Sequence, residues 1–366
     1  MEQKIIISEE IKKELQKIWK ENEINKVLLV CDAAFPYLGT HEEYLNMDIP
    51  YVVFDEFTPN PLYNDVVKGV NCLKKNGCDA ILAIGGGSAM DVAKCIKLFA
   101  TLDTDKVYLE QDFKDNDILL IAIPTTSGTG SESTRYAVIY YEGKKQSVTH
   151  DSIIPKYAIL DYRNLNTLPI YQKKCTMMDA LCQSIESWWS VNATEVSRDY
   201  ARKALTGIIK YMDSYIANAE EGNKEMMIAA NYAGKAICIS QTTAAHAMSY
   251  KITSLYKIPH GRAAFMCLPY VWKYMWDVVK KEKELELKDL FMEIAGAMDC
   301  ESVDESIAKL GMFNKKLFVG DHVTVSMDDV DVLAASVNPT RLGNNPVKLS
   351  EEVLKDLYEK ILSEYM

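Results

Sequence analysis

The stretch AILAIGGGSAMDVAK (residues 80–94) joins an apolar run, three consecutive glycines and the start of a helical pattern. A continuous apolar run is typical of a parallel strand that is covered on both faces. The three glycines let the backbone approach an anionic group closely, and the N-terminus of the next helix offers unpaired N–H groups. The stretch therefore predicts a strand–turn–helix unit of an α/β domain, with Ser88 as the helix N-cap.

The rest of the first 165 residues repeats this alternation. Apolar runs at residues 26–32 (KVLLVCD), 51–57 (YVVFDEF) and 118–126 (ILLIAIPTT) are separated by helical patterns, of which residues 62–75 and 89–100 are the clearest. Strand, crossover helix and strand in repetition predict a parallel sheet with helices on both faces. From residue 171 onward nearly every segment has helical period. We expect a dinucleotide-binding α/β domain over residues 1–165 and an all-α metal- and substrate-binding domain over residues 166–366.

A second loop supports the interpretation of the glycine turn as a nucleotide site. The turn lacks the GxGxxG spacing and by itself could be a plain tight connection. However, IPTTSGTGSESTR (residues 123–135) follows another buried strand and is rich in hydroxyl side chains. Ligands of open α/β sheets bind at the carboxyl ends of the strands, so two such loops predict one nucleotide. The predicted cofactor-binding residues are Asp32, Gly85, Gly86, Gly87, Ser88, Asp91, Thr125, Thr126, Ser127 and Thr129.

Asp32 bears on the choice of nucleotide. A carboxylate at the end of its strand can accept hydrogen bonds from an adenosine ribose and would repel a 2′-phosphate, which favours NAD over NADP. A solvated aspartate at a strand end is the alternative. We therefore expect NAD(P)H as the cofactor, with NAD favoured.

Composition excludes several classes of protein. The 366 residues carry a formal net charge of −11, which argues against nucleic-acid binding. The N-terminal apolar run is too short for a secretory signal, and no stretch has the roughly 18 uncharged apolar residues of a membrane helix. Nine cysteines without a CxxC pattern are typical of reduced thiols. We expect a cytoplasmic enzyme of a small molecule, with no nucleic-acid or membrane partner.

The helical half contains a set of candidate metal ligands. In MDALCQSIES (residues 178–187), Asp179 and Gln183 are spaced i, i+4 and lie on one helix face. Two of the five histidines, His246 and His260, follow in apolar surroundings only fourteen residues apart. Each histidine alone could be a hydrogen-bonded core residue. As a set, the four side chains predict a divalent metal site.

Four motifs carry a resemblance to a known family. GGGSAMDVAK, PTTSGTGSE, MDALCQSIES and HAMSYKITSLYKIPHG occur in this order in iron-containing (group III) alcohol dehydrogenases, and the resemblance covers roughly residues 26–270. It implies the dehydroquinate synthase-like architecture, a divalent metal such as Fe(II) held by Asp179, His246 and His260, and a homodimer. The sequence departs from the family at Gln183, where a histidine ligand is usual. It also departs at Tyr250, where many members carry a further active-site histidine.

The departures point to one branch of the family. DALCQSIESWWSVN with HAMSY, together with residues 147–161 and 336–350, resembles the branch that reduces phosphonoacetaldehyde to 2-hydroxyethylphosphonate. A glutamine oxygen can ligate a divalent metal, although more weakly than imidazole, and Gln183 could instead contact substrate or water. Tyr250 is one candidate proton donor beside water and a ribose hydroxyl. Arg262 is the predicted phosphonate contact, and Lys251 and Arg341 are further candidates.

Two other functions stay open at this stage. A general short-chain alcohol or diol dehydrogenase of the same family would use the same metal and nucleotide but accept uncharged aldehydes. A lyase of the dehydroquinate synthase type shares the architecture and would use NAD without net consumption of NADH. It would also need more basic residues around the site.

Overall fold

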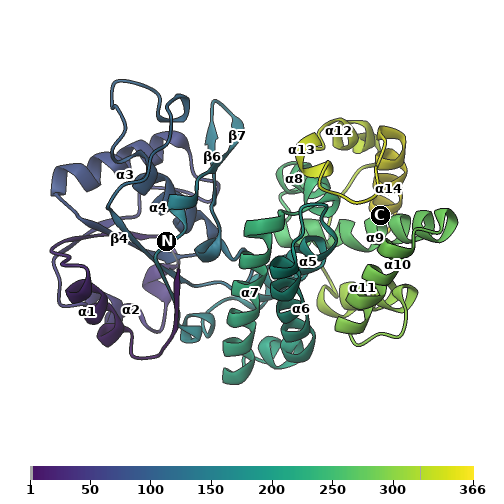
Figure 1. The fold of residues 1–366 in the computed structure, drawn as a ribbon, viewed down its shortest axis with the longest axis horizontal. Coiled ribbons are helices and arrows are strands. Elements are labelled where there is room, and N and C mark those ends of the chain that lie inside the picture. Colours follow the sequence, from purple (N-terminus) through teal and green to yellow (C-terminus); the bar gives the residue numbers. More distant parts are fainter. Residues whose placement is uncertain (1–2, 322) are drawn as a thin grey trace. The chain divides into compact units, whose positions relative to one another are not determined.

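The computed structural model describes residues 3–321 and 323–366, which form two compact units (Figure 1). The first unit runs from the N-terminus to Pro169 and also includes Ala217–Gly234. The second unit consists of Ile170–Ile216 and Lys235–Met366.

The first unit is built on a six-stranded parallel sheet, as the apolar runs predicted. The strand order is β1-β8-β5-β4-β2-β3. Its central strands are buried along their whole length, because helices cover both faces of the sheet. The strands are β1 (Lys4–Ile7), β2 (Val27–Cys31), β3 (Tyr51–Phe54), β4 (Ala80–Gly85), β5 (Leu119–Pro124) and β8 (Tyr157–Leu160).

Two separate hydrophobic clusters hold the helices against the sheet. Helices α3 (Tyr63–Asn76) and α4 (Gly87–Phe99) contribute to the cluster on one face, and α1 (Ile11–Glu21) and α2 (His41–Leu45) contribute to the other. The strands supply alternate side chains to each cluster, Leu28 to the first and Leu29 to the second. This is the doubly wound arrangement expected from the sequence.

The chain reverses its direction across the sheet between β2 and β4. From β2 the chain passes to β3 on one side, whereas from β4 it passes to β5 on the other. The carboxyl ends of β2 and β4 therefore flank the crevice in which open α/β sheets bind their ligands. Asp32 and the glycine turn follow directly after these two strands.

Some elements of this unit were not predicted. The edge strand β1 and its neighbour β8 were missed, as was the antiparallel hairpin of β6 (Tyr136–Tyr141) and β7 (Lys144–Thr149). The first fifteen residues of α7 (Glu220–Ser240) belong to this unit because they pack on the loop that follows β5. There Gly130 and Gly234 leave no room for a Cβ atom, and Asn231 donates hydrogen bonds to Glu132 (2.9 Å) and Ser133 (2.7 Å).

The second unit is helical throughout its described residues. Aromatic rings of α5, α9 and α10 form the centre of its core, with the Trp189 and Trp272 rings 5.4 Å apart and Phe291 against both. No helix among the described residues combines the length and apolarity needed to cross a membrane. The helices are α5 (Ile170–Trp189), α6 (Glu195–Ile216), α8 (Ala244–Tyr256), α9 (His260–Glu282), α10 (Leu285–Ala297), α11 (Val303–Leu317), α12 (Val330–Ala335), α13 (Pro339–Leu342) and α14 (Glu351–Ser363).

Candidate metal centre and nucleotide site

Three predicted metal ligands converge in the second unit. Asp179 lies in α5, His246 in α8, and His260 is the first residue of α9. One ligand atom from each lies within 4.8 Å of the others, and Asp179 Oδ1 is 3.2 Å from His246 Nε2. Ligands at about 2.1 Å from a divalent metal are separated from each other by about 3 Å, so this spacing fits a shared ion.

Gln183 lies one helical turn after Asp179 on the same face of α5. Its side chain is 4% exposed, and its Oε1 atom has no hydrogen-bond partner within residues 3–321 and 323–366. A buried carbonyl oxygen without a donor is costly, at roughly 1–3 kcal/mol. This oxygen therefore fits a site in which an electropositive partner is supplied by a ligand of the protein.

Glu186, which the sequence analysis missed, orients His246. Its carboxylate is completely buried and accepts hydrogen bonds from the backbone N–H groups of Thr243 (3.1 Å) and His246 (3.2 Å), at the start of α8. It also contacts Nδ1 of His246, which leaves Nε2 directed at Asp179. A carboxylate behind a ligating imidazole is a common feature of metal sites. The spacing of Glu186, three residues after Gln183 and seven after Asp179, was the available sequence signal.

The pKa values of the two candidate ligands His246 and Asp179 are shifted in opposite directions, partly because the two groups interact with each other. Burial acts to lower the pKa of His246, but Glu186 and Asp179 outweigh it and raise the pKa to about 9. Burial acts to raise the pKa of Asp179, but His246, His260 and Gln183 together hold it below its usual range. The site thus keeps an ionised carboxylate beside an imidazole that must release its proton before it can bind a cation.

Glycine at position 261 is required by the packing of α9 on α5. A Cβ atom there would lie 2.2 Å from the carbonyl oxygen of Cys175 and 2.5 Å from Cβ of Asp179. The first turn of α9 can therefore approach α5 closely enough for His260 to reach the ligand group.

Tyr250 lies beside the same group. Its ring stacks on His260, with ring centroids 5.6 Å apart and planes 17° from parallel. Burial raises the pKa of the Tyr250 phenol, while the charge of Arg341 acts to lower it. Arg341, in α13, donates a hydrogen bond to Gln241 (2.8 Å). The structure thus places a phenol next to the ligands and a guanidinium near that phenol.

Arg262 is engaged by other protein groups. Its side chain is 2% exposed and donates a hydrogen bond to the side-chain oxygen of Asn314. Its Nε atom lies 3.5 Å from an Asp321 carboxylate oxygen, and its guanidinium carbon lies 3.8 Å from the centroid of the Phe318 ring.

In the first unit, the glycine turn and the hydroxyl-rich loop lie against each other. A Cβ atom on Gly86 would contact Thr126 at 3.5 Å, and one on Gly87 would contact Thr129 at 3.1 Å. Helix α4 begins at Gly87 with Gly86 as its N-cap, so the prediction that Ser88 caps the helix was wrong. The N–H of Gly86 at this position donates to a carboxylate oxygen of Asp32 (3.0 Å).

The other predicted cofactor residues differ in their hydrogen bonds. Thr125 donates its backbone N–H to Gly85 (3.0 Å), while the buried hydroxyl of Ser127 has no hydrogen-bond partner in the part of the chain that the structure describes. Asp91 instead accepts hydrogen bonds from the Ser131 hydroxyl and the Val138 N–H, both at 3.1 Å. Asp91 therefore ties α4 to the hydroxyl-rich loop and to β6.

Lys94, also in α4, was missed by the sequence analysis. Its ammonium group donates to the hydroxyls of Ser131 (3.1 Å) and Thr134 (2.9 Å) and to the carbonyl of Tyr136 (2.8 Å). A buried lysine needs such acceptors, and three of them fix the far end of the loop. Its spacing from Asp91, one turn along the helix, was the signal in the sequence.

Comparison with known proteins assigns both units to one group. A family profile described as iron-containing alcohol dehydrogenase matches residues 2–162, and one described as the C-terminal part of the Fe-containing alcohol dehydrogenase family matches residues 174–362. An NAD-dependent methanol dehydrogenase of Bacillus methanolicus is 29% identical over 337 residues, which cover 88% of each chain. Alcohol dehydrogenase 4 of Saccharomyces cerevisiae is 28% identical over 93% of each chain.

A solved structure resembles the whole chain. The crystal structure of sulfoacetaldehyde reductase from Bifidobacterium kashiwanohense, in complex with NAD+, superposes with a TM-score of 0.89. It is 26% identical in sequence, and the match covers 99% of this chain and 97% of the other.

Proposed function

This chain belongs to the iron-containing alcohol dehydrogenase family, and we propose that it reduces phosphonoacetaldehyde to 2-hydroxyethylphosphonate. It is an alcohol dehydrogenase or aldehyde reductase by family. The observation that carries the finer proposal is Gln183. Its carbonyl oxygen, which has no hydrogen-bond partner among the residues that the structure describes, lies one turn from Asp179, where the family usually has an imidazole.

The metal in this proposal is held by Asp179, Gln183, His246 and His260. The donor set, three neutral groups and one carboxylate, gives a site of net charge +1 with a divalent ion. Oxygen and nitrogen donors together suit Fe(II) or Mn(II), and Zn(II) can also bind such a set. A bound metal supplies Lewis-acid polarisation of the aldehyde oxygen.

The cofactor in this proposal is NADH. The residues that support it are the glycine turn and the Thr and Ser side chains of the adjoining loop, at the reversal point of the sheet. The Asp32 carboxylate at this place would repel the 2′-phosphate of NADPH. A relative that depends on NAD and a similar structure that contains NAD+ agree with this choice.

The substrate assignment rests on charge as well as on Gln183. The similar sulfoacetaldehyde reductase acts, by its name, on a two-carbon aldehyde with an anionic sulfonate. A phosphonate has the same tetrahedral oxygens, for which arginine is the preferred partner. We assign this contact to Arg341, which is partly exposed and whose charge acts on the Tyr250 phenol beside the ligands, whereas Arg262 is 2% exposed and contacts Asn314 and Asp321.

The test is the oxidation of NADH and NADPH by Fe(II)-reconstituted protein, with phosphonoacetaldehyde and propanal compared side by side. We expect kcat/KM to be at least about 100-fold higher for phosphonoacetaldehyde, since a charged contact in a site built for it is worth about 3 kcal/mol. Arg341→Gln should remove most of this preference, with a much smaller effect on turnover of propanal.

Equal or faster turnover of propanal would instead favour a general short-chain alcohol dehydrogenase of the same family. In that case Gln183 would have no meaning for the substrate. A lyase of the dehydroquinate synthase type has less support, because both family matches are to alcohol dehydrogenases. Net consumption of NADH in the assay would exclude it.

A further inference from the structure

Arg262 lies at the centre of a buried cluster that joins three parts of the second unit. The first turn of α9 supplies Arg262, helix α11 supplies Asn314, and the segment after α14 supplies Tyr365. The guanidinium carbon lies 5.3 Å from the centroid of the Tyr365 ring, and the Phe318 ring also contacts it. Asn314 supplies a hydrogen-bond acceptor for the buried guanidinium, and the Asp321 carboxylate supplies an opposite charge 3.5 Å from Nε.

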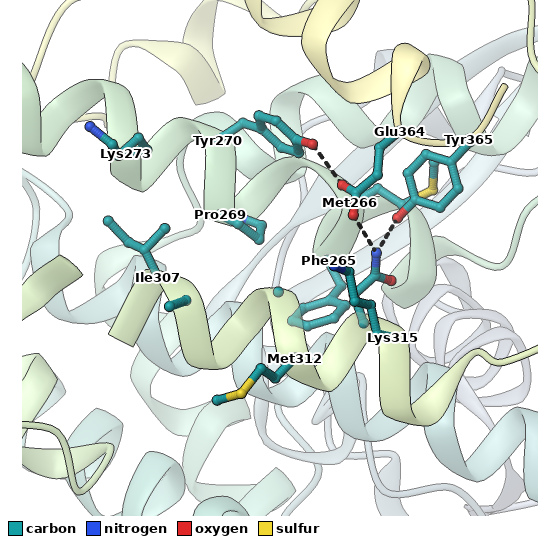
Figure 2. Close-up of a pocket in the computed structure, with 13 residues that line it drawn as sticks. Phe265, Met266, Pro269, Tyr270, Lys273, Ile307, Met312, Lys315, Glu364 and Tyr365 are labelled. Atoms are coloured by element: carbon teal, nitrogen blue, oxygen red, sulfur yellow. Dashed lines mark hydrogen bonds between the residues drawn. The ribbon is translucent and has the colours of Figure 1, made fainter. Parts of the chain in front are cut away.

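The cluster continues through further hydrogen bonds. Asn314 donates to the hydroxyl of Tyr365 (2.8 Å), and Tyr270 of α9 donates to the carboxylate of Glu364 (2.6 Å) (Figure 2). The segment of residues 364–365 is thus bonded both to α11 and to the middle of α9. The bonds fix the N-terminal half of α9 relative to α11.

The same helical turn carries a metal ligand on its other side. Successive residues of a helix are rotated by about 100°, so side chains two positions apart point in nearly opposite directions. His260 faces the ligand group and Gly261 packs on α5, while Arg262 enters the cluster. The position of the His260 imidazole therefore depends on two contacts on different sides of the same helical turn, that of Gly261 with α5 and that of Arg262 with the cluster.

We propose that Arg262 is a positioning residue for the metal centre, and that the cluster of Arg262, Asn314, Phe318, Asp321 and Tyr365 acts through it to hold His260 in place. This inference rests on the proposed metal site. Lysine cannot replace arginine in this role, because it lacks the planar fork that meets Asn314 and Asp321 and stacks between two rings. Supporting contacts of this kind are typically worth 10–100-fold in metal affinity.

The test compares Zn(II) and Mn(II) affinity, by competition with a fluorescent chelator, in wild type and three variants. Arg262→Lys keeps the charge but should bind both ions about tenfold more weakly or worse. Tyr365→Ala changes a residue that is not a candidate metal ligand and should weaken binding in the same direction. Lys273→Ala, on α9 but outside the cluster, is the control and should bind as wild type.

The second readout is the KM for phosphonoacetaldehyde at saturating metal, which should stay within about twofold in Arg262→Lys because the metal-loaded site is intact. A large increase in this KM with unchanged metal affinity would mean that Arg262 contacts the substrate, and would overturn the inference. Unchanged metal affinity in Tyr365→Ala would also overturn it. Failure of the wild type to bind either ion would reject the metal site itself, and with it the role of Arg262.

Discussion

At the scale of single residues, the metal group differs from an ordinary buried polar cluster in one respect. Glu186, His246 and Asp179 satisfy one another, as the residues of a structural network do. Gln183 Oε1 has no hydrogen-bond partner in the described part of the chain, although it is buried beside them. A structural network would have been expected to supply a donor for this oxygen. The unmatched atom is therefore the strongest local sign that a ligand completes the site.

Replacing Gln183 by histidine should tighten metal binding, because imidazole is a stronger donor than an amide oxygen. We expect at least about a tenfold increase in Zn(II) affinity in chelator competition, which corresponds to about 1.4 kcal/mol. Gln172→His, which adds an imidazole at an exposed position of the same helix, is the matched control. If Gln183→His and wild type bind Zn(II) equally well, Gln183 is not a ligand and contacts the substrate or a water molecule instead.

Tyr250→Phe tests the source of the proton. The pKa of Tyr250 is raised by burial, so the phenol stays protonated at neutral pH and can donate. General acid catalysis contributes roughly 100- to 10,000-fold, so kcat for aldehyde reduction should fall at least about tenfold. Metal affinity, measured as for Gln183, should not change. A kcat within twofold of wild type would leave water or a ribose hydroxyl as the donor.

At the scale of helices and strands, the sequence predicted most of the first unit because buried parallel strands carry a strong apolar signal. The ends of α3 and of the central strands agree with the prediction within a few residues. The outer strand β1 is only four residues long and partly exposed, so its pattern is weak. Helix α4 begins two residues earlier than predicted, and the N–H of its N-cap Gly86 is bonded to Asp32, which is distant in sequence.

The candidate metal site shows the same limit of prediction from sequence, which is that contacts between distant residues are not visible in local patterns. Spacing on one helix identified Asp179 and Gln183, the two histidines were identified by their closeness in sequence and their apolar surroundings, and the resemblance to a family supported the set. The roles of Glu186 and of the cluster around Arg262 depend on contacts between helices far apart in sequence, which spacing does not report.

Gly261→Ala tests whether the approach of α9 to α5 sets the site. The added Cβ atom would meet backbone and Cβ atoms at 2.2 and 2.5 Å, so the first turn of α9 must move away. We expect Zn(II) affinity to fall at least about tenfold, in line with losses of supporting contacts. Gly311→Ala in α11 is the control, because its Cβ atom meets nothing within 4 Å. The control should gain about 0.5–1 kcal/mol of stability from helix propensity. Normal Zn(II) binding by Gly261→Ala would contradict the argument.

The link between α4 and the hydroxyl-rich loop should make stability depend on pH through Asp91. Burial raises the pKa of Asp91 to about 6, although Lys94, Val138 and Ser131 act to lower it. Between about pH 4 and 6 the unfolded chain releases this proton while the folded protein keeps it, so stability falls as pH rises. The loss is about 3 kcal/mol for a shift of roughly two pKa units.

Urea unfolding of Asp91→Asn measures this contribution. The free energy of unfolding of the variant minus that of wild type should rise by about 3 kcal/mol as the pH is raised from 4 to 7. The reason is that wild type loses stability when Asp91 ionises, whereas asparagine does not ionise. Asp105→Asn, an exposed change of the same kind in the same unit, is the control. A constant difference between Asp91→Asn and wild type over this pH range would show that Asp91 is not protonated in the folded protein.

At the scale of the whole molecule, the chemistry is divided between the two units. The residues that support nucleotide binding belong to the first unit, and the four candidate metal ligands belong to the second. Each group is held by contacts within its own unit: Asp91 and Lys94 hold the hydroxyl-rich loop, while Glu186 and Gly261 hold the candidate metal ligands. NADH and the metal ion should therefore each stabilise a different set of segments.

Hydrogen exchange measured by mass spectrometry tests this division. NADH alone should slow exchange in peptides that cover residues 85–91 and 125–134, and Mn(II) alone should slow exchange in residues 179–186 and 243–262. A ligand slows exchange in the segments that it stabilises, and the effect grows with the free energy of binding. A ligand at 100 times its Kd stabilises the folded protein against global unfolding by about 2.7 kcal/mol. Protection of residues 85–134 by Mn(II) alone would place a metal ligand in the first unit. Protection of neither set by NADH would reject the glycine turn as the nucleotide site.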